Sequence, residues 1–265
     1  MRENKRTQGE TKFFLGVRPT QLSKGRALGG LELQMIYRLD SHLKLYQASA
    51  LGGNVEKSGQ IMGIDTLDLS PCGDVAGFCR QVSGVVTQHG FGGVACLFRG
   101  GTNPCLEEAV ASLAELCCGW GIPLIVPEAY GQVGEYPKVF ISTAISGGSL
   151  EVRFRQAMEQ YGRGRLVMDI EAMGEDFLLP APKGVGEPLG EDEIYEAIVR
   201  ENADVFFSSE LCARYFTYQN GEHSLRFVLF DDQGSVREKI RLARQWKLWG
   251  VAVSLDDYQR RVGEK

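Results

Sequence analysis

The sequence contains no apolar run of the ~20 residues that a membrane-spanning helix needs, and its N-terminus lacks the apolar core of a secretory signal. Its formal net charge is −5, and its opening segment 2–12 gathers Lys and Arg. We interpret residues 1–12 as a disordered basic tail rather than a binding arm. Nucleic acids and anionic membranes bind clustered positive charge, so the charge distribution excludes both from the expected partners. The missing membrane span and signal segment predict a cytoplasmic protein.

Cysteine and histidine patterns that signal structural or catalytic sites are also missing. Seven cysteines, an odd number, include no C-x-x-C pair, so we expect reduced and mostly buried thiols. The chain has no G-x-S-x-G nucleophile motif. Its histidines lack Cys or Asp at ligand spacing, which argues against zinc; they are His42, His89 and His223. A loose dinucleotide motif at 90–95 follows a helix instead of a strand, so we predict neither a metal nor a cofactor.

What the sequence does have is a repeated alternation of short apolar runs with amphipathic stretches. This alternation is typical of parallel strands joined by crossover helices, and a hydrophobic content of 43% is enough for a full core. Each run is rich in Val, Ile or Leu, as strands buried on both faces should be. The expected strands are 61–69, 93–98, 122–126, 139–144, 165–170 and 250–255.

Helix boundaries are marked by capping residues. Asn103 followed by Pro104 predicts a helix start, and Gly119 predicts its end. Ser235 with Glu238 forms a capping box that opens a helix running toward residue 249. Two more helices are expected at 149–161 and 191–202.

Two parts of the chain break this rhythm. Between 171 and 232, prolines, a helix and an Asn-Gly turn at 220–221 predict a small α+β insertion at about 172–230. Nearer the N-terminus, the runs 33–39 and 43–48 are separated by a hairpin loop rather than a helix. We therefore expect one domain over residues 13–265, with an atypical N-terminal portion.

Three stretches, in order, resemble glycoside hydrolase family 18, the chitinases and spore-cortex N-acetylglucosaminidases. They are 78–99, where a helix leads into HGFGGVACLFR, then 165–180, RLVMDIEAMGEDFLLP, and 215–258 with its hairpin and GVAVSLDD strand. The resemblance implies a TIM (β/α)8 barrel with the insertion between strand 7 and helix 7, and an active site at the C-terminal ends of the strands. It also implies, by analogy, a spore-associated role.

The family's catalytic carboxylates are absent from the matching positions. The resemblance places Gly92, Ala95, Leu97 and Arg99 where the fourth strand of the family carries three Asp and the Glu that acts as general acid. It places Ala144 and Ile145 at the family's Tyr and Asp on the sixth strand, and Ser254 near its floor tryptophan. A guanidinium keeps its proton near neutral pH, so Arg99 cannot serve as the acid, and we assign no catalytic residue.

Other polar residues are expected at the barrel mouth. Glu128 follows one strand, and Asp169 and Glu171 lie on one face at the end of another. Arg99, Glu128 and Glu171 are expected to form a polar cluster, either a salt-bridged plug or a ligand clamp. Tyr130 is either a stacking surface for a sugar or a packed loop aromatic.

The leading hypothesis is a catalytically inactive, glycosidase-like protein that binds an N-acetylglucosamine-containing glycan or a protein partner at this mouth. The alternatives are an active hydrolase that uses Glu128 or Glu171 as a relocated acid, and an assembly protein with a plugged cleft. The ligand and the oligomeric state stay open.

Overall fold

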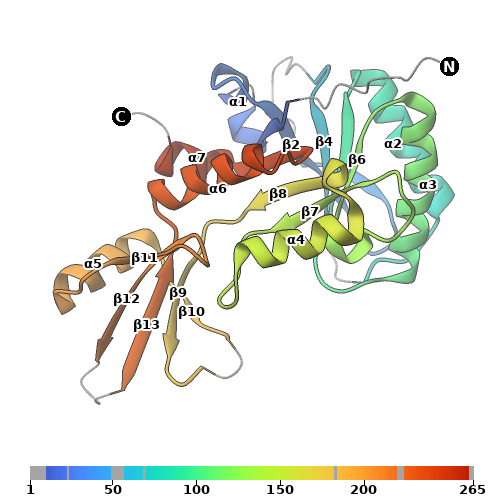
Figure 1. Ribbon diagram of the computed structural model, residues 1–265. Coiled ribbons are helices and arrows are strands. Elements are labelled where there is room, and N and C mark those ends of the chain that lie inside the picture. Colours follow the sequence, from blue (N-terminus) through green and yellow to red (C-terminus); the bar gives the residue numbers. More distant parts are fainter. Residues whose placement is uncertain are drawn as a thin grey trace.

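A computed structural model describes residues 10–22, 24–48, 57–67, 70–181, 184–219 and 224–262, which form a barrel and a smaller antiparallel sheet (Figure 1). Eight parallel strands pair in a closed ring, with β1 bonded to both β14 and β2. In ring order they are β1 (Lys12–Val17), β14 (Gly250–Ser254), β8 (Leu166–Ile170), β7 (Lys138–Ser142), β6 (Leu124–Pro127), β5 (Gly93–Leu97), β4 (Ile61–Thr66) and β2 (Leu31–Leu39). The predicted TIM barrel is confirmed.

The inside of the barrel is filled by one buried apolar residue from each strand. Since side chains alternate along a strand, every second residue points inward and the others pack under the outer helices. The inward set comprises Phe14, Leu33, Ile61, Ala95, Ile125, Phe140, Val167 and Ala252. These side chains make the lower barrel a packed core and leave only the ends of the strands for a site.

Helices cover the barrel unevenly. The outer layer contains α2 (Val75–His89), α3 (Pro104–Trp120), α4 (Leu150–Tyr161) and α6 (Gln233–Gln245), and α7 (Leu255–Arg261) follows β14. In contrast, β6 leads to β7 through a single 3-10 turn, Glu128–Tyr130, and α1 (Lys24–Ala27) is one turn long. The short strand β3 (Leu45–Gln47) folds back antiparallel on β2, which confirms the hairpin in the atypical N-terminal portion.

Three predicted helix boundaries need correction, and one of them is the end of α6, which lies at Gln245 rather than near residue 249. The Asn103 side chain caps α3 as expected, but the helix continues to Trp120 and ends at Gly121, whose φ of +69° suits glycine. The N-cap of α6 is Asp232 and not Ser235. Ser235 is the third helical residue, and its hydroxyl oxygen accepts the Asp232 amide proton, so the capping box begins three residues earlier than predicted.

Replacing Asn103 with alanine should lower the free energy of unfolding by about 1 kcal/mol. Its Oδ1 accepts the amide protons of Cys105 and Leu106, and its Nδ2 donates to the Pro71 carbonyl. Urea denaturation of Asn103→Ala measures the loss. Ser149→Ala is the matched control, because Ser149 stands at the N-cap of α4 without a side-chain capping bond. Equal losses for both variants would contradict this account of the cap.

The insertion lies between β8 and α6, as predicted (Figure 1). Its sheet follows the order β10-β9-β13-β12-β11, and α5 packs on one face through Ile194 and Ala197. The Asn220-Gly221 turn falls outside the described residues, although the strands that it joins pair antiparallel. The elements are β9 (Gly174–Leu178), β10 (Glu187–Pro188), α5 (Glu191–Glu201), β11 (Phe206–Ser208), β12 (Ala213–Gln219) and β13 (Leu225–Phe230).

The expectation of reduced thiols is wrong for one pair. Cys72, in the loop after β4, forms a disulfide with Cys105 in the first turn of α3, which the sequence spacing of 33 residues did not signal. Residues 1–9 of the expected tail lie outside the described residues, and Lys12 already belongs to β1. Within the described ranges, no helix combines the length and apolar character needed to cross a bilayer.

Candidate functional site at the barrel mouth

A cavity of about 690 Å³ opens at the C-terminal ends of the barrel strands. Its floor is apolar and its rim is polar, which is the usual composition of a small-molecule site. The floor includes Leu33, Met35, Leu97, Phe140 and Ala252. The rim includes Arg99, Glu128, Ser142, Asp169, Glu171, Ser254 and Asp257. The fold thus brings four of the five predicted site residues to one cavity.

Arg99 lies just beyond β5 and does not fill the mouth. Its side chain is 76% exposed, and its Nη2 lies 3.5 Å from Oδ2 of Asp65 on the neighbouring strand β4. Inward positions of β5 hold Ala95 in the buried core and Leu97 in the cavity wall. The inner side of β5 therefore presents no carboxyl group. Asp65 was missed by sequence reasoning, although it lies two residues after Gly63 and four after Ile61, which places it on the same inward face.

Glu128 is ion-paired with a residue that sequence reasoning also missed. Arg153 of α4 donates both terminal nitrogens to its carboxylate, with Nη1 3.4 Å from Oε1 and Nη2 in close contact with Oε2. This fork arrangement holds the Glu128 carboxylate through two charge-assisted hydrogen bonds. Arg99 and Glu128 consequently have separate partners, and the predicted cluster of Arg99, Glu128 and Glu171 does not form a plug.

Asp169 and Glu171 form the carboxyl pair of the mouth. Both point inward from β8 and its end, and Ser142 donates its hydroxyl to Glu171. Burial, and then the negative charge of Glu171, raise the pKa of Asp169 to about 7. Near neutral pH, Asp169 is therefore partly protonated and able to give or accept a proton at the cavity wall.

The remaining predicted positions lie elsewhere. Tyr130 is 1% exposed, its ring packs edge-on against Phe98 with centroids 5.9 Å apart, and its hydroxyl donates to the Gly101 carbonyl. Of the two alternatives for Tyr130, the packed aromatic is the one observed. Ser142, the last residue of β7, lines the rim of the mouth, whereas Ala144 and Ile145 lie beyond the strand and do not line the cavity.

Ser254 and Asp257 complete the rim. The hydroxyl of Ser254 donates to Oδ2 of Asp257 at 2.5 Å and accepts the Asp257 amide proton, which closes the first turn of α7. Within the described parts of the chain, no three His, Cys, Asp or Glu residues gather as metal ligands. The mouth can therefore offer hydrogen bonds and one proton-exchanging carboxyl group.

No protein-family model and no curated protein sequence matches the chain. Its structure resembles a chitinase from Chromobacterium violaceum, with a TM-score of 0.66 at 13% identity over 96% of this chain and 95% of that one. The spore cortex-lytic enzyme SleL of Bacillus megaterium gives 0.65 at 14% identity over 94% and 71% of the two chains. The Group II chitinase catalytic domain 2 of Ostrinia furnacalis gives 0.65 at 15% over 96% and 92%. The TM-scores show that this chain shares the barrel fold of these proteins, and at identities of 13–15% they show the fold alone.

Proposed function

We propose that this protein is a catalytically inactive, glycosidase-like protein that binds an amino-sugar glycan at the barrel mouth. One observation carries the proposal: the cavity is open where barrel enzymes hold their substrates, yet its β5 wall ends in Ala95, Leu97 and Arg99. The binding surface is present, and the group that would donate a proton from β5 is not.

The loss of a general acid is large enough to abolish efficient turnover. Proton donation by a positioned acid is worth ~10²–10⁴-fold in rate. The resemblance to family 18 implies substrate-assisted chemistry, in which the enzyme adds mainly that proton and residues that orient the acetamido group. Arg99 pairs with Asp65 and remains a cation, so it supplies neither function.

The shape and polarity of the mouth favour a sugar. An apolar floor of Leu33, Met35 and Phe140 suits the C–H face of a pyranose ring, and the carboxylate and hydroxyl groups above it accept hydrogen bonds from sugar hydroxyls. The similar structures are named chitinases and a spore cortex-lytic enzyme, which supports an amino-sugar ligand and a spore-associated role. A protein partner at the mouth, and a cytoplasmic location, stay predictions.

Chito-oligosaccharides should stabilise the folded protein without being cleaved. At a ligand concentration of 100 times Kd, binding adds about 2.7 kcal/mol, which for a chain of this size raises Tm by several degrees. Ser142→Trp should abolish the shift because the indole occupies the cavity, whereas Gln156→Trp on the exposed face of α4 should not. Differential scanning calorimetry measures the shift, and the absence of any ligand response in the parent protein would refute glycan binding.

The second candidate is a hydrolase with a relocated acid. The pKa of Asp169, raised to about 7, favours this residue over the predicted candidates Glu128, which is ion-paired, and Glu171. Release of a chromophore from an N-acetylglucosaminide, lost in Asp169→Asn and retained in Glu128→Gln, would establish the hydrolase and overturn inactivity. The third hypothesis, a plugged cleft, is not supported by the open cavity, so an assembly role requires another surface.

A further inference from the structure

A second cavity, of about 680 Å³, lies near the N-terminal ends of the barrel strands, away from the mouth. It is bounded by α6, α7, the start of β1 and the turn that leads into β2. Its apolar surface comes from Phe13, Leu28, Leu31, Ile240, Tyr258 and Val262. Its positive charge comes from Lys12, Arg237, Arg241 and Arg244, and we call it the basic groove.

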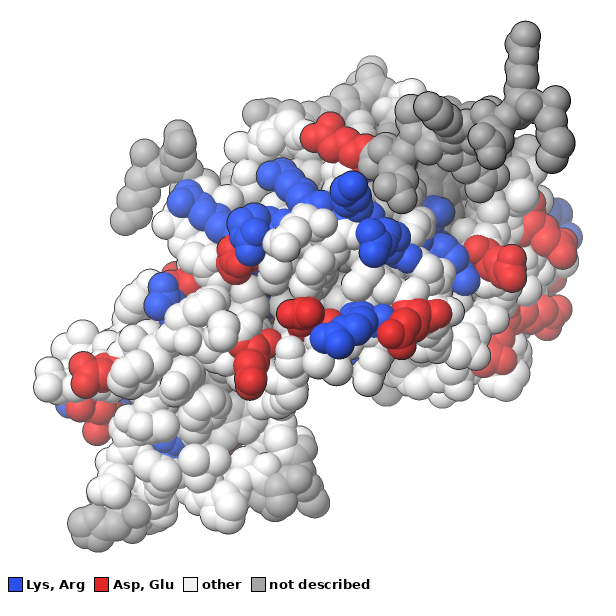
Figure 2. Space-filling model, viewed as in Figure 1, with Lys and Arg blue, Asp and Glu red and all other residues white. Residues whose placement is uncertain are grey.

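The basic groove has an excess of positive charge. The three arginines are spaced by four and three residues, so they share one face of α6. Among the described residues that line the groove, Glu10 is the only acid. Arg241 also pairs with Glu238, with Nη2 2.6 Å from Oε1. Figure 2 shows basic residues crowded over the α6 region. The fold adds Lys12, which is far from α6 along the chain.

The outer face of α5 has the complementary composition. Asp192, Tyr195, Glu196 and Val199 recur at helical spacing on the side away from the buried Ile194, and all four are exposed. Tyr195 is 56% exposed and Val199 is 81% exposed, which is unusual for two large apolar residues one turn apart. In Figure 1, α5 lies on the outer side of the insertion, whereas α6 lies on the barrel.

We propose that a second copy of this chain docks the outer face of its α5 into the basic groove. Asp192 and Glu196 of one copy then face the α6 arginines of the other. Tyr195 and Val199 cover the apolar floor around Phe13 and Ile240. The α5 face matches the groove in both charge and apolar surface, which favours a second copy of this chain over a nucleic acid. A nucleic acid backbone would pair with the arginines but leave the apolar floor uncovered.

The two surfaces belong to different parts of the molecule, so the contact is head-to-tail and leaves the pair with one unused α5 face and one unused groove. Successive additions give chains or a closed ring. One helix face covers less than the ~800 Å² per partner of a standard stable interface, so association is weak and depends on concentration. Salt weakens it because the ion pairs lie at the surface. The barrel mouth remains open, and this assembly is independent of glycan binding.

Sedimentation equilibrium on the full chain tests the proposal. The average mass should rise with protein concentration at low salt and fall toward the monomer when salt is raised. Glu196→Arg and Arg241→Glu should each be monomeric. An equal mixture of the two should associate, because Arg241→Glu supplies an intact α5 and Glu196→Arg supplies an intact basic groove. That recovery also shows that both variants are folded.

Charge reversals on α4 serve as controls. Glu159→Arg and Arg155→Glu, which make the same charge changes on the exposed face of α4, should associate like the parent. A parent protein that stays monomeric up to about 0.5 mM would overturn the proposal. Its dissociation constant would then lie near or above about 1 mM, which corresponds to a binding free energy of only about 4 kcal/mol. The proposal would also be overturned if Glu196→Arg or Arg241→Glu associated like the parent, or if an equal mixture of the two variants stayed monomeric. Binding of a fluorescent poly-glutamate peptide by a strictly monomeric chain would assign the groove to an acidic partner instead.

Discussion

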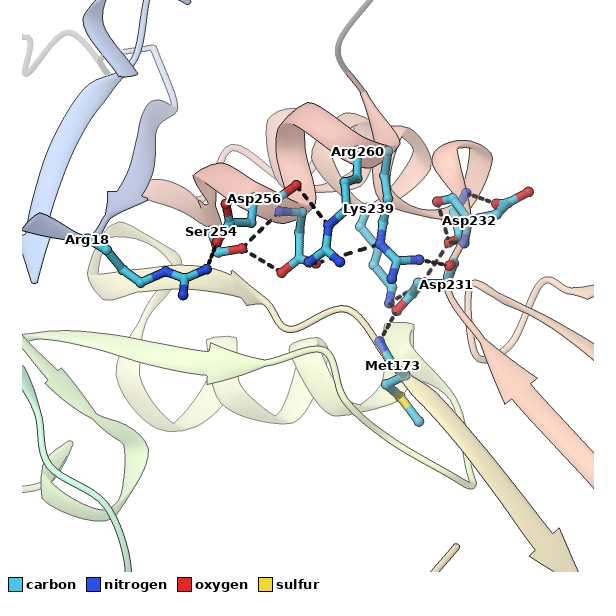
Figure 3. A network of polar contacts seen from close by, with 11 residues as sticks. Arg18, Met173, Asp231, Asp232, Lys239, Ser254, Asp256 and Arg260 are labelled. Atoms are coloured by element: carbon cyan, nitrogen blue, oxygen red, sulfur yellow. Dashed lines mark hydrogen bonds and ion pairs between the residues drawn. The ribbon is translucent and has the colours of Figure 1, made fainter. Parts of the chain in front are cut away.

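Replacing Lys239 with methionine is expected to lower the free energy of unfolding by about 3–5 kcal/mol. Lys239 and Asp231 are both fully buried, with Nζ 2.7 Å from Oδ1 and 2.8 Å from Oδ2 (Figure 3). Without the ammonium group, the Asp231 carboxylate stays buried and uncompensated. Guanidinium denaturation measures the loss, and Lys247→Met on the surface is the control, expected to change stability by less than about 0.5 kcal/mol.

The large effect reflects the position of Asp231 in the fold. It directly follows β13, accepts the Met173 amide proton ahead of β9, and accepts the Ser235 hydroxyl in α6. Its backbone carbonyl accepts a bond from Arg261 of α7. Adding Asp231→Asn to Lys239→Met removes the uncompensated charge and should recover part of the loss. A single Lys239→Met variant within about 1 kcal/mol of the parent would show that the pair contributes little.

Asp169→Asn is expected to gain stability over its parent as the pH rises. The difference between their free energies of unfolding should be roughly 2–4 kcal/mol more favourable to the variant at pH 8 than at pH 3.5. The folded state raises the pKa of Asp169 from 3.8 to about 7, so it holds this proton more tightly than the unfolded chain does. The parent protein therefore loses stability as pH rises from about 4 to 7, and the loss persists above that window. Asparagine cannot ionise, so the variant escapes this loss.

The pH dependence of the difference in unfolding free energy between the variant and its parent checks this expectation. Glu171→Gln is a second variant to compare with the parent. Removing the charge of Glu171 lowers the pKa of Asp169, so this variant should gain stability over the same pH window, but less than Asp169→Asn does. A difference that does not vary between pH 3.5 and 8 would mean that water reaches the carboxyl group freely. The same result would weaken the case for Asp169 as a proton donor.

Local sequence signals predicted most of the barrel. The runs at 93–98 and 250–255 match β5 and β14 within one residue, because strands buried on both faces need uninterrupted apolar residues. The first strand was missed, since Lys12–Val17 directly follows a basic segment that suggested a tail. The absence of a helix between β6 and β7 also had no signal, because a 3-10 turn of three residues carries no periodicity.

The site was predictable in location but not in its pairings. Arg99, Glu128, Asp169 and Glu171 meet because the ends of parallel strands converge at one rim. The partner of Arg99 comes from the neighbouring strand and that of Glu128 from α4, and those distances depend on the closed barrel. The basic groove was hidden for the same reason, because the −5 net charge averages over surfaces that the fold separates.

The disulfide between Cys72 and Cys105 makes one connection near the mouth depend on the redox state of its surroundings. Disulfides persist in oxidising compartments, whereas glutathione keeps such pairs as thiols inside most cells. In a reduced chain, the loop after β4 and the first turn of α3 would still be joined by the bond from Asn103 Nδ2 to the Pro71 carbonyl, 3.1 Å long. In reducing surroundings the side-chain amide of Asn103 therefore links the two segments by a hydrogen bond, whereas in oxidising surroundings the disulfide links them covalently.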